Sequence, residues 1–163
     1  MSKRGALKAK IHSDVLKVIE FVKKYNEAFG INASDLYVDG NCGNFHRILR
    51  TIFPEAKPYM VFTFKFVGGF VPAHVHTKIA GKYFDIGGMQ KKGRWNVGKH
   101  TLKGPVQRIE PKDDYAISDF SNNFKGKLKD SYNSDASSRE LSQKHHVETL
   151  VKTIEFAQKG FSI

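Results

Sequence analysis

Cysteine is almost absent from this sequence: one occurs among 163 residues, so no disulfide can form within the chain. The sequence also lacks any apolar run near the roughly 18 residues that a membrane-spanning helix needs. Its first stretch, MSKRGALKAK, has no apolar segment of the kind found in signal peptides. These absences argue against a disulfide-stapled secreted scaffold. They predict a soluble, cytoplasmic protein without a membrane partner. The small size of the chain also suits a bacterial or phage-encoded protein.

Acidic residues are also scarce, with 16 Asp and Glu against 27 Lys and Arg and a formal net charge of +11. The basic residues gather in two stretches, residues 3–10 and residues 91–103. An excess of this size indicates an acidic partner, either nucleic acid or an acidic protein or peptide substrate. A solubilising lysine-rich surface is the alternative, because net charge says nothing about clustering in space.

The beginning of the chain divides at a change in composition. Residues 1–12 are basic and poor in large apolar side chains, which predicts a mobile N-terminal segment. Residues 13–163 are predicted to form one α+β domain, because the whole chain is about one domain long. We expect the first helix to begin at Ser13 or Asp14, since either side chain can cap a helix. Its apolar face is expected to include Leu16, Phe29 and the apolar residues between them.

Helical spacing of apolar residues occurs twice more in the sequence. A second helix is predicted from Cys42 to just before Pro54, because the residue that precedes a proline is disfavoured in a helix. A long C-terminal helix is predicted from Ser137, which starts a capping-box pattern. Residues 31–41, between the first two helices, are expected to form a loop or a short extended piece.

The middle of the chain changes to the period of a β-strand. Residues 59–67, YMVFTFKFV, alternate in the manner of a strand. Residues 70–79 and 82–86 are predicted to form two further strands joined by a tight turn, with Pro72 at a sheet edge or a bulge. Residues 87–135 are expected to be loops with one or two short strands. Helices followed by antiparallel strands and a last helix indicate the α+β class.

The single cysteine lies at the start of a predicted helix and is flanked by glycines. Unpaired backbone N–H groups and the helix dipole at such a position stabilise a thiolate. The same N–H groups can donate to an oxyanion. Cys42 is therefore a candidate nucleophile. Its backbone N–H and the side chain of Asn41 are candidate oxyanion donors.

The strand pair that follows supplies candidates for a base and for its orienting group. A turn at Ala80 and Gly81 places His76 opposite Asp85 and makes His74 the diagonal neighbour of Asp85 on the same face. A carboxylate beside an imidazole is the base-orienting half of a catalytic triad. We predict the triad Cys42, His74 and Asp85. His76 remains a second candidate base.

These motifs resemble those of the papain-like cysteine hydrolases, in particular the transglutaminase-like and cell-wall-endopeptidase-like branches. The resemblance covers residues 36–88 and is carried by the glycine-flanked cysteine and by HVHTKIAGKYFD, residues 74–85. It implies a minimal papain-like fold with the nucleophile at a helix start, packed on a small antiparallel sheet. It also implies a thiol protease-like hydrolase or acyltransferase that acts on peptide, isopeptide or amide bonds through an acyl-enzyme. In that family Cys42, His74 and Asp85 would be nucleophile, base and orienting residue, and no cofactor is needed.

Two other interpretations of the same residues stay open. His74, His76 and Asp85 have the ligand types of a two-histidine, one-carboxylate metal centre. The cations and Trp95 within residues 91–99 are instead typical of a nucleic-acid-binding or protein-binding module without catalysis. Metal analysis tests the first interpretation, and salt-dependent binding of polyanions tests the second.

Three further histidines receive no chemical role from the sequence. His46 follows Cys42 by about one helical turn and is expected to be a surface or packing residue. His145 and His146 fall in the C-terminal helix and are expected to be solvated.

Overall fold

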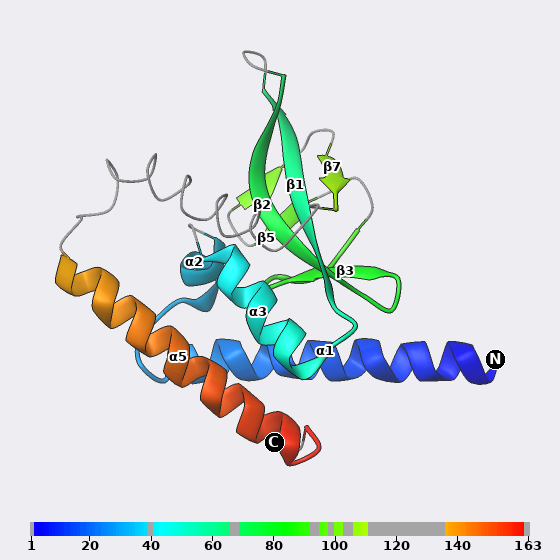
Figure 1. Ribbon diagram of the computed structural model, residues 1–163, viewed down its shortest axis with the longest axis horizontal. Helices are drawn as coiled ribbons and strands as arrows, with labels where there is room; N and C mark the ends of the chain where they lie inside the picture. The colour runs from blue at the N-terminus through cyan, green and yellow to red at the C-terminus, as the bar shows by residue number, and fades with distance from the viewer. Residues whose placement is uncertain are drawn as a thin grey trace.

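The computed structural model shows an α+β architecture, as the sequence predicts, with helices at one end of a long, twisted β-hairpin (Figure 1). The residues that the structure describes are 2–38, 41–65, 69–91, 95–97, 100–102, 106–110 and 136–161.

The helices of the described part of the chain are α1 (Lys3–Glu27), α2 (Ala33–Val38), α3 (Cys42–Ile52) and α5 (Ala136–Gln158). The strands are β1 (Lys57–Lys65), β2 (Gly69–Ile79), β3 (Lys82–Asp85), β4 (Gly88–Gln90), β5 (Trp95–Val97), β6 (His100–Leu102) and β7 (Val106–Ile109). A five-stranded antiparallel sheet has the order β4-β3-β2-β1-β7, and β5 and β6 form a separate two-stranded sheet. Strands β4 to β7 exceed the one or two short strands expected after residue 87, and residues 111–135 of that stretch lie outside the described residues.

Helix α1 begins ten residues earlier than the sequence predicts, at Lys3 rather than at Ser13. Ser2 is its N-cap, and the side chain of Ser2 accepts a hydrogen bond from the backbone N–H of Gly5. Asp14 lies inside the helix and pairs with Lys10 at 2.7 Å instead of acting as a cap. The prediction that residues 1–12 precede the helix is therefore wrong. The N-terminal turns of α1 extend past the sheet (Figure 1).

Helix α2 corrects the expectation of a loop over residues 31–41. The side-chain oxygen of Asn32 accepts hydrogen bonds from the backbone N–H groups of Ser34 at 2.9 Å and Asp35 at 3.2 Å. These bonds satisfy donors that would otherwise be unpaired at the helix start. The next helix, α3, starts at Cys42 and ends before Pro54, as predicted.

The hairpin formed by β2 and β3 has the predicted register. Ala80 and Gly81 both have positive φ, 48° and 85°, which suits a tight turn between twisted antiparallel strands. The observed pairs are Thr77 with Phe84, Lys78 with Tyr83, and Ile79 with Lys82. Because side chains alternate between the two faces of a strand, this register directs His74, His76 and Asp85 to one face.

A β-bulge interrupts β2 where the sequence predicts an edge or a bulge. Val61 of β1 pairs with His74, but the next residue, Phe62, pairs with Pro72, so Ala73 has no partner in β1. An extra residue of this kind bends a strand and redirects the neighbouring side chain. The bulge thus lies directly beside His74.

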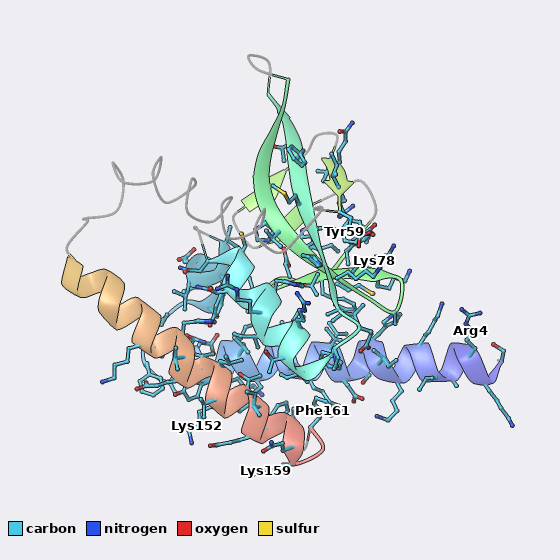
Figure 2. All side chains as sticks on the ribbon, in the orientation of Figure 1. Arg4, Tyr59, Lys78, Lys152, Lys159 and Phe161 are labelled. Carbon is cyan, nitrogen blue, oxygen red and sulfur yellow. The ribbon has the colours of Figure 1, made fainter. Side chains whose placement is uncertain are left out.

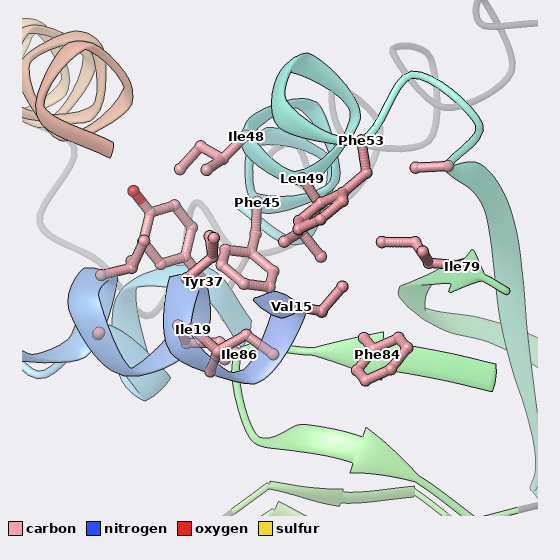
Figure 3. Packing of buried hydrophobic residues seen from close by; sticks show 14 of the residues in the cluster. Val15, Ile19, Tyr37, Phe45, Ile48, Leu49, Phe53, Ile79, Phe84 and Ile86 are labelled. Atoms are coloured by element: carbon pink, nitrogen blue, oxygen red, sulfur yellow. The ribbon is translucent and has the colours of Figure 1, made fainter. Parts of the chain in front are cut away.

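The apolar core lies between the helices and one face of the sheet (Figure 3). Its members are almost completely excluded from water, and they include Val15, Val18, Ile19, Val22, Tyr37, Phe45, Ile48, Leu49, Ile79, Phe84, Ile86 and Phe156. The first and last residues of the predicted apolar face of the first helix are exposed: Leu16 is 42% exposed and Phe29 is 58% exposed. The core fixes α3 against β2, and this contact positions the candidate site.

Candidate active site

Cys42 is the first residue of α3 and is 5% exposed. It packs against Val75 of β2 and Met60 of β1. The backbone N–H groups in the first turn of a helix have no partner within the helix, and such groups can bind an anion. The side-chain oxygen of Asn41, the N-cap, accepts a hydrogen bond from the Asn44 amide at 3.2 Å.

His74 and Asp85 are in contact, as the hairpin register predicts. His74 Nε2 lies 3.0 Å from Asp85 Oδ2, and each residue is 1% exposed. The contact joins β2 to β3 just beyond Thr77 and Phe84, the paired residues farthest from the turn. Burial strengthens such a contact, because the interior of a protein screens charge less than water does.

The imidazole of His74 interacts with Cys42 as well as with Asp85. Burial lowers the pKa of His74, but the hydrogen bonds and charges of Asp85 and Cys42 outweigh burial and raise this pKa to about 9. Since Nε2 faces Asp85, the nitrogen that can meet the thiol is Nδ1. The structure therefore brings the three residues Cys42, His74 and Asp85 into one buried cluster.

Asp85 is held by donors on both carboxylate oxygens. Its Oδ1 accepts hydrogen bonds from the backbone N–H of Gly87 and from Gln90 Nε2, both at 2.8 Å. Burial raises the pKa of Asp85, but its contacts with His74 and His76 hold this pKa well below its usual range. Asp85 is thus a stable carboxylate that can orient and charge-pair an imidazole. Sequence analysis missed Gln90, which lies beyond the turn that follows β3.

His76 occupies a different position from His74 and is fully buried. Its Nδ1 accepts a hydrogen bond from Arg108 Nε at 2.9 Å, and its Nε2 lies 3.4 Å from Asp85 Oδ2. Burial, together with the charges of His74 and Arg108, lowers the pKa of His76 to about 4 although Asp85 opposes the shift. Both ring nitrogens face other groups, so the geometry favours His74 over His76 as a base for Cys42.

Arg108 comes from β7 and was missed by sequence analysis. Its Nη2 donates to the backbone oxygen of Lys91 at 2.9 Å, and its guanidinium lies 4.5 Å from the ring centroid of Tyr83. Next to it, Lys78 lies over the ring of Tyr59 at 5.3 Å (Figure 2). Lys78 also lies 5.6 Å from the centre of the Tyr83 ring. These cation–aromatic contacts cover the side of the cluster that faces away from the apolar core.

His46 is buried and packs between α3 and β2. Its Nδ1 lies 2.9 Å from Thr77 Oγ1. This agrees with the packing role, one of the two alternatives expected from sequence. The contact ties the helix that carries Cys42 to the strand that carries His74.

The expectation that His145 and His146 are solvated is wrong. His145 Nε2 lies 2.7 Å from the side-chain oxygen of Asn26, and His146 Nδ1 lies 3.3 Å from the hydroxyl of Tyr37. Both histidines are half-buried. They attach α5 to α1 and α2, away from the Cys42 cluster.

The histidines and the carboxylate of the cluster also have the composition of a metal site. Ligand atoms of His74, His76 and Asp85 lie within 4.8 Å of one another. However, Arg108 donates to one of these histidines at 2.9 Å and brings a positive charge close to the space that a cation would take. The side chains are therefore of the types that bind a metal ion, but the positive charge of Arg108 opposes the binding of a cation.

The stretch of cations and Trp95 in residues 91–99 cannot be placed as a binding surface. Residues 92–94 and 98–99 lie outside the described residues, as do the side chains of residues 95–97. No helix in the described ranges is long and apolar enough to cross a membrane.

The fold and the cluster together define an α+β protein with a buried Cys-His-Asp arrangement at the junction of a helix start and a β-hairpin. The chain belongs to the Phage YunG-like protein family, whose model matches residues 18–134. That segment contains all the cluster residues described above. Comparison with curated proteins and comparison with solved structures give no match. The family description agrees with the expected phage or bacterial origin.

Proposed function

We propose that this protein is a cysteine-dependent hydrolase or acyltransferase of minimal papain-like type. Cys42 is the nucleophile, His74 the base and Asp85 the residue that orients the base. The observation that carries the proposal is the buried imidazole of His74, which contacts Asp85 through Nε2 and whose pKa is raised by both Asp85 and Cys42. This is the set of roles that nucleophilic acyl transfer requires.

The reaction would run through an acyl-enzyme. Cys42 Sγ, as thiolate, attacks the carbonyl carbon, and the backbone N–H groups at the start of α3 stabilise the oxyanion. The tetrahedral intermediate collapses, the bond to the leaving amine breaks, and protonated His74 gives that amine its proton through Nδ1. Water then attacks the thioester while His74 takes its proton, which releases the acid and regenerates the thiolate–imidazolium pair. In acyl transfer an amine replaces the water.

The substrate that fits this proposal is a peptide, an isopeptide or another amide. The net charge of +11 supports an acidic protein or peptide over a basic one. Cys42 is only 5% exposed, so the carbonyl group has to displace a side chain in order to reach it. Met60 packs on Cys42, is half-buried, and has the flexibility for such a movement.

Alkylation of Cys42 by iodoacetamide tests the proposal without knowledge of the substrate. The thiolate displaces iodide, so the rate reports how much nucleophile is present. We expect alkylation of the wild type at pH 6 to be fast for a protein thiol and to fall at least tenfold in His74→Gln and Asp85→Asn. His145→Gln is the matched control, because it removes a half-buried histidine remote from the site. Rates that do not depend on His74 would refute the proposal.

A metal-dependent reaction is the second candidate, and it is favoured by the closeness of His74, His76 and Asp85. It predicts that the purified protein retains stoichiometric zinc, manganese or iron through dialysis. It also predicts that His76→Gln and His74→Gln both lose the metal. Elemental analysis of these variants, with His145→Gln as control, distinguishes the candidates. Retained metal that depends on both histidines would replace the triad.

A further inference from the structure

We propose that Arg108 and His76 are positioning residues for this site, forming a fixed chain that keeps Asp85 directed at His74. The inference rests on the proposed function, since Asp85 matters only if His74 is the base for Cys42. Neither residue contacts the thiol, and neither is among the triad residues that the sequence predicts. Their role is to act through Asp85.

The guanidinium of Arg108 determines which nitrogen of His76 carries the proton. An arginine side chain has only donors, so His76 Nδ1, at 2.9 Å from Arg108 Nε, must be an acceptor. A neutral imidazole with an acceptor Nδ1 carries its hydrogen on Nε2. Arg108 is itself fixed by the backbone oxygen of Lys91 and by the ring of Tyr83. The orientation of His76 is therefore imposed by a rigid neighbour.

His76 Nε2 faces the same carboxylate oxygen that His74 uses, although the contact does not have the geometry of a hydrogen bond. The distance to Asp85 Oδ2 is 3.4 Å, longer than the 3.0 Å contact from His74. The contact between His76 and Asp85 is therefore electrostatic and not a formed hydrogen bond. Because its Nδ1 accepts a hydrogen bond from Arg108, the ring of His76 is neutral and offers Asp85 a dipole rather than a second cation.

Asp85 keeps its position when His74 changes charge during the proposed catalytic cycle. When His74 gives its proton to the leaving group it becomes neutral, and its attraction to Asp85 falls. The hydrogen bonds from Gln90 and Gly87 to Oδ1, together with the ring of His76 beside Oδ2, continue to hold the carboxylate in place. Asp85 is therefore in the same orientation when His74 accepts a proton from water.

The tautomer of His76 can be measured in the wild-type protein. Nitrogen-15 NMR of the imidazole rings separates a protonated nitrogen from an acceptor nitrogen. We expect His76 to be neutral at pH 7, with hydrogen on Nε2 and a hydrogen-bonded acceptor at Nδ1. Hydrogen on Nδ1, or a charged ring, would overturn the inference whatever the fate of any variant.

Variants of Arg108 measure the effect on the site. Arg108→Met removes the donor, and we expect the alkylation rate of Cys42 at pH 7 to fall roughly fivefold to tenfold, as for loss of one ordinary hydrogen bond. Arg108→Gln keeps an N–H donor without the charge and is expected to restore most of the rate. Lys57→Met is the matched control. It removes a cation from β1 that pairs with Glu110 and leaves the rate within about twofold.

The results separate this inference from the proposed function. If alkylation depends on His74 and Asp85 but Arg108→Met matches Lys57→Met, the positioning role is refuted and the triad stands. If Arg108→Gln is as slow as Arg108→Met, the hydrogen bond is not the cause, and the inference also fails. If alkylation of the wild type does not depend on His74, the proposed function itself has failed.

Discussion

Two regions of this protein are excluded from water to the same degree but differ in chemistry. The core between the helices and the sheet is made almost entirely of apolar side chains, such as Val18, Ile48 and Phe84. The cluster around Asp85 buries a carboxylate and two imidazoles, each no more than 1% exposed. Burial stabilises the first region through the hydrophobic effect. In the second it carries a desolvation cost, which hydrogen bonds and charges must offset.

Stability alone accounts for the apolar core but not for the buried cluster around Asp85. An apolar replacement of the whole cluster would avoid the cost of desolvation and often preserves or increases stability in other proteins. The cost of burying His74, His76 and Asp85 is consistent with the chemical role proposed above for this cluster. Perturbed titration of this kind, next to a thiol, is typical of catalytic sites.

Removal of one charged member from the polar cluster should have the largest effect on stability. Asp85→Ala leaves His74 and His76 buried without their carboxylate, and we expect the free energy of unfolding to fall by about 3–5 kcal/mol. Chemical denaturation measures this loss. Glu20→Ala, on the exposed part of α1, is the control and should change stability little. If Asp85→Ala is as stable as the control, the contrast between the two regions is lost.

A cavity in the apolar core should cost nearly as much stability without affecting the thiol. Ile19→Ala on α1 is expected to lower the free energy of unfolding by about 2–5 kcal/mol, whereas Leu16→Ala, at a position 42% exposed, should lower it by less than about 1 kcal/mol. The alkylation rate of Cys42 in the folded protein should stay at the wild-type value in both variants. A lower alkylation rate of Cys42 in Ile19→Ala would show that the core and the site are coupled.

The free energy of unfolding should fall on both sides of neutral pH, because the pKa values of the buried histidines are shifted in opposite directions. The pKa of His74 is about 9 against an ordinary 6.5, so its contribution is complete below pH 6.5 and is lost as the pH rises towards 9. The pKa values of His76 and His146 are about 4, so their contributions are lost as the pH falls from 6.5 towards 4. Each histidine contributes a slope of at most about 1.4 kcal/mol per pH unit, so the two on the acid side contribute at most about twice that.

Denaturation curves between pH 4 and 9 test these signs. We expect a maximum near neutral pH, a flat alkaline side in His74→Gln and a shallower acid side in His146→Gln. A wild-type stability that does not fall between pH 6.5 and 9 would contradict the charged state assigned to His74.

The smallest effect is expected at the residue that covers the thiol. Met60→Ala should raise the alkylation rate of Cys42 several-fold, because Met60 packs against the cluster that Cys42 forms with Val75. Met89→Ala, at a position 50% exposed, is the control and should leave the rate unchanged. Equal rates in both variants would mean that reagents reach Cys42 by another path.

Local rules explain which parts of the site could be predicted from sequence. The turn at Ala80 and Gly81 fixes the register of a short hairpin, so the neighbourhood of His74 and Asp85 followed from counting residues. The start of α3 at Cys42 followed from flanking glycines and the apolar pattern. Arg108 could not be found this way, because it is 32 residues from its partner and reaches it only through the pairing of β7 with β1.

The helix boundaries that were missed have equally local causes. The early turns of α1 bury few apolar side chains, so helical periodicity begins only near Val15, whereas helix propensity and the Ser2 cap extend the helix to Lys3. The short α2 has too few residues for periodicity to show, and its signal is the Asn32 cap. His145 and His146 were misjudged because contacts between distant helices leave no trace in local pattern.

Acylation of the thiol by p-nitrophenyl acetate tests the central claim most directly. Cys42 should displace p-nitrophenolate and take up one acetyl group, visible by intact-mass spectrometry and absent in Cys42→Ser. In the wild type the acetyl group should then be lost to water, whereas in His74→Gln it should form more slowly and persist. No acetyl adduct on Cys42 of the wild type, or equal formation and decay in His74→Gln, would contradict a Cys42–His74–Asp85 acyl-transfer site.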